Sequence, residues 1–148
     1  MAAPDPVHPE TPALAEATVI YDPDCGFCRW SLALLLRADR GRRLRPVALG
    51  TAQADELLAD LQPAQRAASW HLISPDGRRD SGGAALPKVL ELLPFGAGPA
   101  GVFARFPTAT DRGYRWVAEH RSSLSRLLPS SAKRRATSVI RARTSALT

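Results

Sequence analysis

The feature that most constrains the fold is the alternation of short β-favouring runs with stretches of helical periodicity. A strand is predicted over Thr18–Tyr21, and the apolar residues of the segment 30–36 recur at helical spacing directly after it. A second strand is expected over 44–49, and Thr51 can cap the helix that follows. This strand–helix–strand–helix order is typical of α/β proteins, in which helices connect parallel strands.

The next part of the chain predicts a hairpin and then more helices. Strands are expected over 70–73 and 78–81, and the Ser-Pro-Asp-Gly turn between them is so short that they must pair antiparallel. The following helix has apolar residues at i, i+3, i+4 and i+7, namely Leu86, Val89, Leu90 and Leu93. Helices around 102–106 and 111–128 complete an α/β fold with a βαβαββα core and extra C-terminal helices.

Length and composition predict one domain with two appendages. The chain has 148 residues, of which 45% are apolar and 23% charged, a size and mixture typical of one globular domain. Residues 1–16 contain four prolines and are expected to be a disordered leader, and residues 17–128 are the predicted domain. Residues 129–148 are expected to be a flexible basic tail, because they carry five basic residues, no acidic residue and few large aliphatic ones.

The distribution of charge makes a nucleic-acid partner unlikely. The net charge is +6, but the first 128 residues hold 15 basic and 14 acidic side chains, so the predicted domain is nearly neutral. The longest apolar run, Leu32–Leu36, is far shorter than the ~20 residues that span a bilayer, so no integral membrane segment is expected. The first residues lack the basic and apolar regions of a secretory signal, so we expect a cytoplasmic location, where cysteine pairs are normally reduced.

The two cysteines of the chain lie close together, in the segment Cys25-Gly26-Phe27-Cys28. This C-x-x-C pattern follows a predicted strand and opens a predicted helix, the position that is typical of a redox-active pair. At i and i+3 of a helix the two sulfurs share one face and can form a disulfide after a small adjustment. Unpaired N–H groups at the helix start favour a thiolate at Cys25, so Cys25 is the predicted attacking thiol and Cys28 the resolving one.

Two aspartates precede the pair and have separate predicted roles. Asp24 is expected to be the helix N-cap, where its carboxylate opposes ionisation of Cys25 while the helix dipole favours it. Asp22 has two interpretations that the sequence leaves open. It can exchange a proton with Cys28, or it can simply start the Asp-Pro turn.

The two cysteines also allow interpretations other than a redox pair. A zinc site would need ligands from His8, His71 and His120, which lack metal-ligand spacing, so no metal is expected. No cofactor is expected, because the glycine-rich fingerprint of dinucleotide sites is absent. Phe27 is a candidate contact residue for a partner. The alternative function is a non-catalytic binding module, with a redox-sensing cysteine pair and a basic tail that makes the contact.

Three segments resemble one known family, the DCC family of thiol-disulfide oxidoreductases. Its D-x-x-C-x-x-C motif is matched by Asp22, Cys25 and Cys28. Gly82–Leu93 resembles the family's G-x-x-A helix, and Tyr114–Arg121 is similar to its closing Y-x-x-V-A-x-x-R segment. The resemblance covers roughly residues 17–125.

The resemblance implies a thioredoxin-like fold and an enzyme that exchanges disulfides with a protein or a low-molecular-weight thiol. Two departures are visible. Pro23 stands where the family usually has glycine, and it stiffens the approach to Cys25. Thioredoxins also place a cis-proline before the third strand, where it helps to hold an incoming peptide, and no proline is present at Ala67-Ala68-Ser69.

Overall fold

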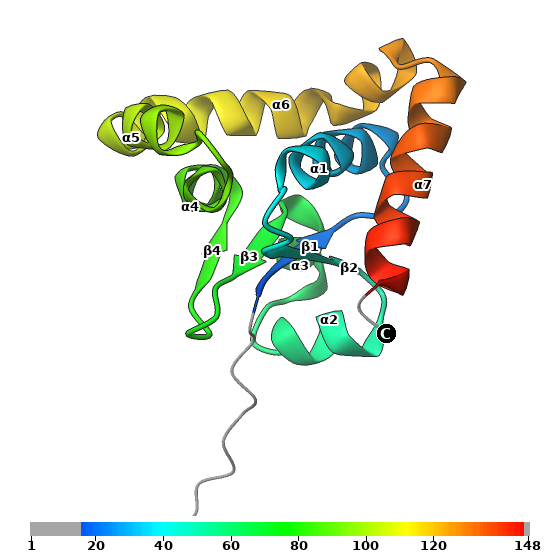
Figure 1. The fold of residues 1–148 in the computed structure, drawn as a ribbon, viewed down its shortest axis with the longest axis horizontal. Helices are drawn as coiled ribbons and strands as arrows, with labels where there is room; N and C mark the ends of the chain where they lie inside the picture. Colours follow the sequence, from blue (N-terminus) through cyan, green and yellow to red (C-terminus); the bar gives the residue numbers. More distant parts are fainter. Residues whose placement is uncertain (1–15, 147–148) are drawn as a thin grey trace, which may run out of the picture.

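The computed structural model describes residues 16–146, and within them four strands form one mixed sheet (Figure 1). The strands are β1 (Ala17–Tyr21), β2 (Leu44–Ala48), β3 (His71–Ile73) and β4 (Arg79–Ser81), in the sheet order β2-β1-β3-β4. β1 pairs parallel with β2 and antiparallel with β3, and β3 pairs antiparallel with β4. This topology confirms the predicted thioredoxin-like α/β core and the predicted antiparallel hairpin.

The helices of the described residues follow the predicted order, with two additions, one before the hairpin and one at the end of the chain. They are α1 (Gly26–Ala38), α2 (Ala52–Leu57), α3 (Pro63–Ala68), α4 (Ala85–Leu92), α5 (Ala97–Arg105), α6 (Pro107–Leu127) and α7 (Ser130–Ser145), with a short 3₁₀ turn, η1 (Gly82–Ala84), before α4. Thr51 caps α2 as expected, since its hydroxyl accepts a hydrogen bond from the Ala54 N–H at 3.3 Å. The sequence did not predict α3, because this helix has no buried residue and therefore no apolar face.

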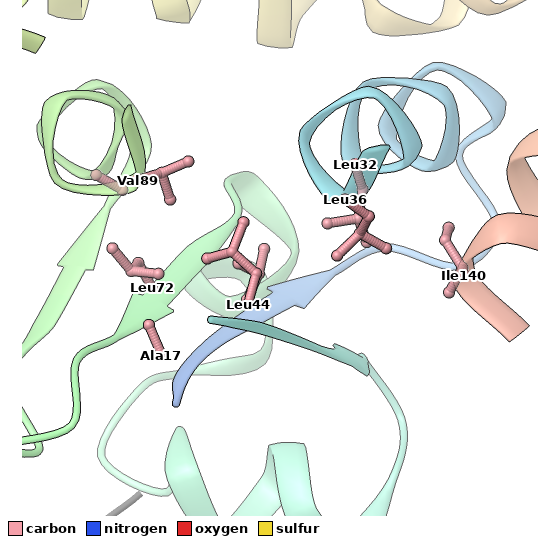
Figure 2. Packing of buried hydrophobic residues seen from close by; sticks show 9 residues of the cluster. Ala17, Leu32, Leu36, Leu44, Leu72, Val89 and Ile140 are labelled. Carbon is pink, nitrogen blue, oxygen red and sulfur yellow. The ribbon is translucent and has the colours of Figure 1, made fainter. Parts of the chain in front are cut away.

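Both faces of the sheet are covered, and β1 supplies alternate side chains to each. Val19 belongs to the larger cluster, in which β1 to β3 pack against α1, α4 and α7 (Figure 2). Its neighbour Ile20 belongs to a second cluster on the other face, with Val47, Leu58 and Ile73. The side chains of a strand alternate with a period of two, so this short strand anchors helices on both faces.

The structure corrects the expectation of a flexible tail after residue 128. Residues Ser130–Ser145 form α7, which packs along α1 and closes one side of the larger cluster (Figure 1). Ala136, Ile140 and Arg143 lie four and three residues apart, so they share one face, and all three are buried. The sequence suggests a tail because this face contains a single large aliphatic residue and an arginine. The predicted leader, residues 1–16, lies outside the described residues except for Glu16.

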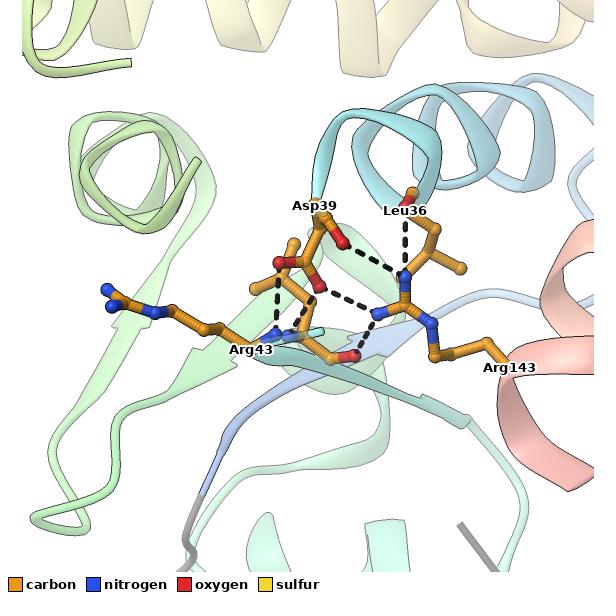
Figure 3. A network of polar contacts seen from close by, with 5 residues as sticks. Leu36, Asp39, Arg43 and Arg143 are labelled. Atoms are coloured by element: carbon orange, nitrogen blue, oxygen red, sulfur yellow. Dashed lines mark hydrogen bonds and ion pairs between the residues drawn. The ribbon is translucent and has the colours of Figure 1, made fainter. Parts of the chain in front are cut away.

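A buried ion pair fixes α7 to the rest of the fold (Figure 3). The Arg143 guanidinium donates to the Asp39 carboxylate at 2.7 Å, and also to the backbone carbonyls of Leu36 at 2.9 Å and Leu44 at 3.0 Å. The same carboxylate accepts hydrogen bonds from the N–H groups of Arg43 and Leu44. The end of α1, the start of β2 and the last turns of α7 therefore meet at one satisfied charge pair.

Helix α6 forms an outer layer that crosses α1 (Figure 1). It rests on the η1 turn, where a Cβ added to Gly83 would lie 2.8 Å from the Asp111 Cα. At Gly82, which has a φ of +61°, an added Cβ would lie 3.3 Å from the Tyr114 ring. Glycine is thus required here both by the turn and by the close approach of α6. Within residues 16–146, none of the helices has the length and apolarity needed to cross a membrane.

Candidate active site

The cysteine pair lies where β1 gives way to α1, as predicted. Cys25 is itself the N-cap of α1, since its backbone is extended and its sulfur accepts a hydrogen bond from the Cys28 N–H at 3.2 Å. The prediction that Asp24 is the N-cap is wrong. Asp24 is exposed, and its own N–H donates to the Asp22 Oδ1 at 2.9 Å, so a turn made by Asp22 comes before the cap and shifts it by one residue.

The two thiols are close, free and half-buried. A side-chain hydrogen bond joins them, and burial is the main cause that raises the pKa of the Cys28 thiol to about 12. The hydrogen bond to Cys25 and the charges of Cys25 and Asp22 raise the pKa further, and the Arg121 guanidinium opposes them. Cys28 therefore holds its proton near neutral pH, which makes it a poor nucleophile until a base removes the proton.

Asp22 combines features of both roles that the sequence left open. Its Oδ1 makes the turn to Asp24, as in the purely structural interpretation. Its Oδ2 lies 3.9 Å from an Arg121 nitrogen, and its side chain lines the same cavity as Cys28. One carboxylate oxygen thus shapes the loop, while the other lies near Arg121, in a cavity that Cys28 also lines.

The remaining residues of the motif hold the start of α1 in place. Gly26 is buried, and a Cβ added to it would lie 2.6 Å from the Ser125 hydroxyl oxygen at the end of α6. Phe27 is half-buried, with its ring 5.8 Å from that of Trp30, and forms part of a cavity wall. Arg29 donates a hydrogen bond to the Pro23 carbonyl at 2.6 Å, which braces the loop that leads to Cys25.

A cavity of about 340 Å³ lies between α1, β1 and α6 and reaches Cys28. Its walls are mainly apolar, and include Val19, Phe27, Leu32, Leu35, Trp70 and Leu86. Polar groups come from Asp22, Cys28, Ser31, Ser69, Tyr114 and Arg121. Sequence reasoning missed this cavity. The Y-x-x-V-A-x-x-R segment held a signal for its α6 wall. The last three specified residues follow the tyrosine by three, four and seven positions, so all four share one face of a helix.

Tyr114 connects α6 to the segment just before β3. Its hydroxyl accepts a hydrogen bond from the Trp70 N–H at 3.1 Å, and burial is the main cause that raises its pKa to about 12. The Trp70 indole donates to the Gly82 carbonyl at 3.0 Å. Among the described residues no peptide bond is cis, so Trp70 and its neighbours reach β3 by an ordinary trans backbone.

Two of the three histidines considered as metal ligands, His71 and His120, make contacts that do not involve the cysteines. His71 is buried in β3, where its ring nitrogens contact the Ser81 hydroxyl at 2.7 Å and the Arg66 carbonyl at 3.1 Å. His120 is exposed on α6 and stacks on Trp116, while His8 lies outside the described residues. In the part of the chain that the structure describes, no group of three or more His, Cys, Asp or Glu side chains is arranged to hold a metal ion.

A close cysteine pair at the first turn of the first helix in a thioredoxin-like domain defines a class of protein, the thiol–disulfide oxidoreductases. Comparison with family models gives the same class. Residues 19–127 match the family described as DCC1-like thiol-disulfide oxidoreductase, so the chain belongs to this family. The search of curated proteins and the search of solved structures found no similar protein.

Proposed function

We propose that this protein exchanges disulfides through Cys25 as the attacking thiol and Cys28 as the resolving thiol. The observation that supports these roles is the asymmetry of the pair. Cys25 caps α1, and its sulfur accepts a hydrogen bond from the Cys28 backbone N–H at the start of the helix, where an attacking sulfur is expected. Cys28 lies one turn further along, with its pKa raised to about 12 by burial and by the hydrogen bond to Cys25.

The proposed cycle balances as two successive exchanges. The Cys25 thiolate attacks one sulfur of a disulfide R–S–S–R′, forms the mixed disulfide Cys25–S–S–R, and releases R′S⁻, which takes a proton from solvent. Cys28 gives its proton to Asp22 and attacks the Cys25 sulfur, so the Cys25–Cys28 disulfide forms and RS⁻ leaves with the proton from Asp22. The substrate gains two electrons, and the cysteine pair loses them.

Two thiol groups of a reductant, from one dithiol or two monothiols, return the pair to the dithiol by the reverse exchange and become a disulfide themselves. Both electrons move through sulfur, so the cycle needs no bound cofactor. The substrate in this proposal is a protein or small thiol or disulfide. The cytoplasm is the compartment that we propose, because its thiol pools would keep the pair reduced between turnovers.

Trapping of mixed disulfides tests the two roles. A Cys28→Ser variant should retain its partner as a mixed disulfide on Cys25, because no thiol remains to release it. A Cys25→Ser variant should trap much less, and the variant with both substitutions sets the background. The reverse pattern, with trapping by Cys25→Ser alone, would overturn the assignment of attacker and resolver.

In the alternative, a binding module with a redox-sensing pair, the basic contact would come from a packed helix rather than from a flexible tail, with Arg134, Arg135 and Arg141 still exposed. Helix α7, which carries the basic residues, packs on α1 and into the larger core cluster. Turnover separates the two functions. An oxidoreductase reduces many equivalents of disulfide when a thiol reductant is supplied, whereas a switch consumes one equivalent and stops.

A further inference from the structure

We propose that the cavity beneath α6 binds the apolar group of the substrate, and that this substrate is a small disulfide or thiol with an aromatic or branched aliphatic group. The inference rests on the proposed function and narrows it, because the disulfide chemistry alone would also suit an extended protein chain. Three observations carry it: the walls of the cavity, its place beside the sulfurs, and the occupied backbone before β3.

The walls suit a compact apolar group. The volume of about 340 Å³ falls within the range of pockets that bind small molecules. Leu32, Leu35 and Leu86 provide aliphatic surface, and Trp70 and Phe27 provide aromatic surface. A strongly charged substrate would lose its hydration there with few groups to compensate it.

The charged groups of the cavity are concentrated at the end near the cysteines. Asp22 and Arg121 face each other at 3.9 Å, and both interact electrostatically with Cys28. Their opposite charges offset each other, so this end has no strong preference for an anion or a cation. A ligand would therefore meet charged groups only where its sulfur must react.

The cavity also has the right place relative to the sulfurs. Cys28, Leu32 and Leu35 follow one another on the same face of α1, so this wall extends along the helix for about 10 Å. At one end of this wall the Cys28 thiol hydrogen-bonds to the Cys25 thiol. An apolar group that occupies the cavity would therefore present an attached sulfur at its cysteine end.

The backbone before β3 is already occupied. An extended peptide that pairs with this segment needs free N–H and C=O groups. The Trp70 N–H donates to the Tyr114 hydroxyl at 3.1 Å, and the Trp70 carbonyl accepts from the Gly82 N–H at 3.2 Å. Tyr114 thus takes the Trp70 N–H hydrogen bond that would otherwise be offered to an incoming chain.

The closing segment of the family resemblance lines this cavity with each of its specified residues. Tyr114, Val117, Ala118 and Arg121 all lie on its α6 wall. Disulfide exchange through the cysteine pair does not by itself require Val117 or Ala118. A binding wall accounts for a small aliphatic residue and an alanine at these two places, because larger side chains would fill the space.

The test compares an apolar disulfide with a polar one. We would measure second-order rate constants of the reduced protein with 2-phenylethyl 2-hydroxyethyl disulfide and with bis(2-hydroxyethyl) disulfide. Each is divided by the rate constant of the same disulfide with a free small thiol, which removes intrinsic reactivity. We expect the normalised rate constant of the phenylethyl compound to exceed that of the hydroxyethyl compound by about tenfold or more. The normalised rate constant of a protein disulfide should be lower than that of either compound.

Two leucine variants locate the effect. Ala118→Leu reduces the cavity and should abolish most of the preference for the phenylethyl compound over the hydroxyethyl one. Ala109→Leu makes the same change at an exposed position of α6 and should leave both rate constants unchanged. Because Ala118→Leu could also disturb folding, a second measurement uses the wild-type protein with 2-phenylethanol as an inhibitor. This alcohol should compete with the phenylethyl disulfide and leave the rate constant of the hydroxyethyl disulfide unchanged.

The outcomes separate this inference from the function on which it rests. Equal normalised rate constants, no competition by 2-phenylethanol, or a faster reaction with a protein disulfide would each overturn the cavity proposal while the oxidoreductase stands. Absence of exchange with every disulfide, or exchange that survives in Cys25→Ser, would overturn the proposed function and the cavity proposal with it.

Discussion

Replacing Arg143 with methionine should destabilise the whole domain, although this residue lies in a segment that the sequence suggests is a tail. The guanidinium is 10% exposed and the Asp39 carboxylate is fully buried. Methionine fills much of the same space but donates no hydrogen bond. The substitution therefore leaves a buried carboxylate without its counter-charge and three backbone carbonyls, those of Leu36, Asp39 and Leu44, without their side-chain donor.

The magnitude follows from what the carboxylate keeps. Breaking a buried ion pair by removing one partner typically costs about 3–5 kcal/mol. Asp39 retains hydrogen bonds from the Arg43 and Leu44 N–H groups at 2.9 and 2.8 Å, so we expect the lower end, about 3 kcal/mol. For a domain of this size that loss lowers Tm by about 6–12 °C.

Urea unfolding followed by circular dichroism measures this loss. The slope of the free energy of unfolding against urea should not change, because the surface exposed on unfolding stays nearly the same. Arg141→Met is the matched control, since Arg141 is exposed on the same helix, and it should stay within about 0.5 kcal/mol of wild type. If Arg143→Met matched this control, α7 would not be an integral part of the domain and the reasoning would fail.

Three further predictions concern the site and the helix above it. In the reduced protein, the alkylation rate constant of Cys28 should still be rising at about pH 10, because its pKa is raised to about 12; a plateau near neutral pH, measured by mass spectrometry, would contradict this. Asp22→Asn keeps an oxygen that can accept the Asp24 N–H but loses the base, so stopped-flow kinetics should show release of the second thiol slowed by about a hundredfold and the first step little changed. An unchanged second step would remove the proton-transfer role. Gly83→Ala should cost about 1–3 kcal/mol in urea unfolding, because its Cβ would lie 2.8 Å from the α6 backbone, whereas Gly98→Ala, with open space around it, should not destabilise the protein.

The parts of the fold that the sequence predicted depend on neighbouring residues. Val19 and Ile20 alternate between the two faces of the sheet, and Thr51 caps its helix, because both patterns arise within a few residues. The part that it missed depends on distant partners. Arg143 is buried only because Asp39, 104 residues earlier in the chain, supplies a counter-charge, and no local pattern signals such a pair.

The same distinction applies to the site. The C-x-x-C pair and its place at the start of α1 were predicted from adjacent residues, and the structure confirms both. The predicted N-cap, Asp24, was one residue too early. Asp22 makes the turn before the helix, and Cys25 caps it. The cavity was missed because its far wall comes from α6. The local pattern of that helix marks one face, but the position of this face over α1 follows from tertiary packing at the η1 turn.

Helix α6 therefore links the chemistry of the cysteines to the choice of substrate. Burial is the largest cause of the raised pKa of Cys28, which lines the same cavity as Val117, Ala118 and Arg121 of α6. The same three side chains form one wall of the cavity. A helix that moved away from α1 would open the cavity to water and lower the pKa of Cys28 together, because both depend on excluding solvent from one space. An apolar ligand in the proposed binding cavity would replace water there and so add to the desolvation that keeps Cys28 protonated.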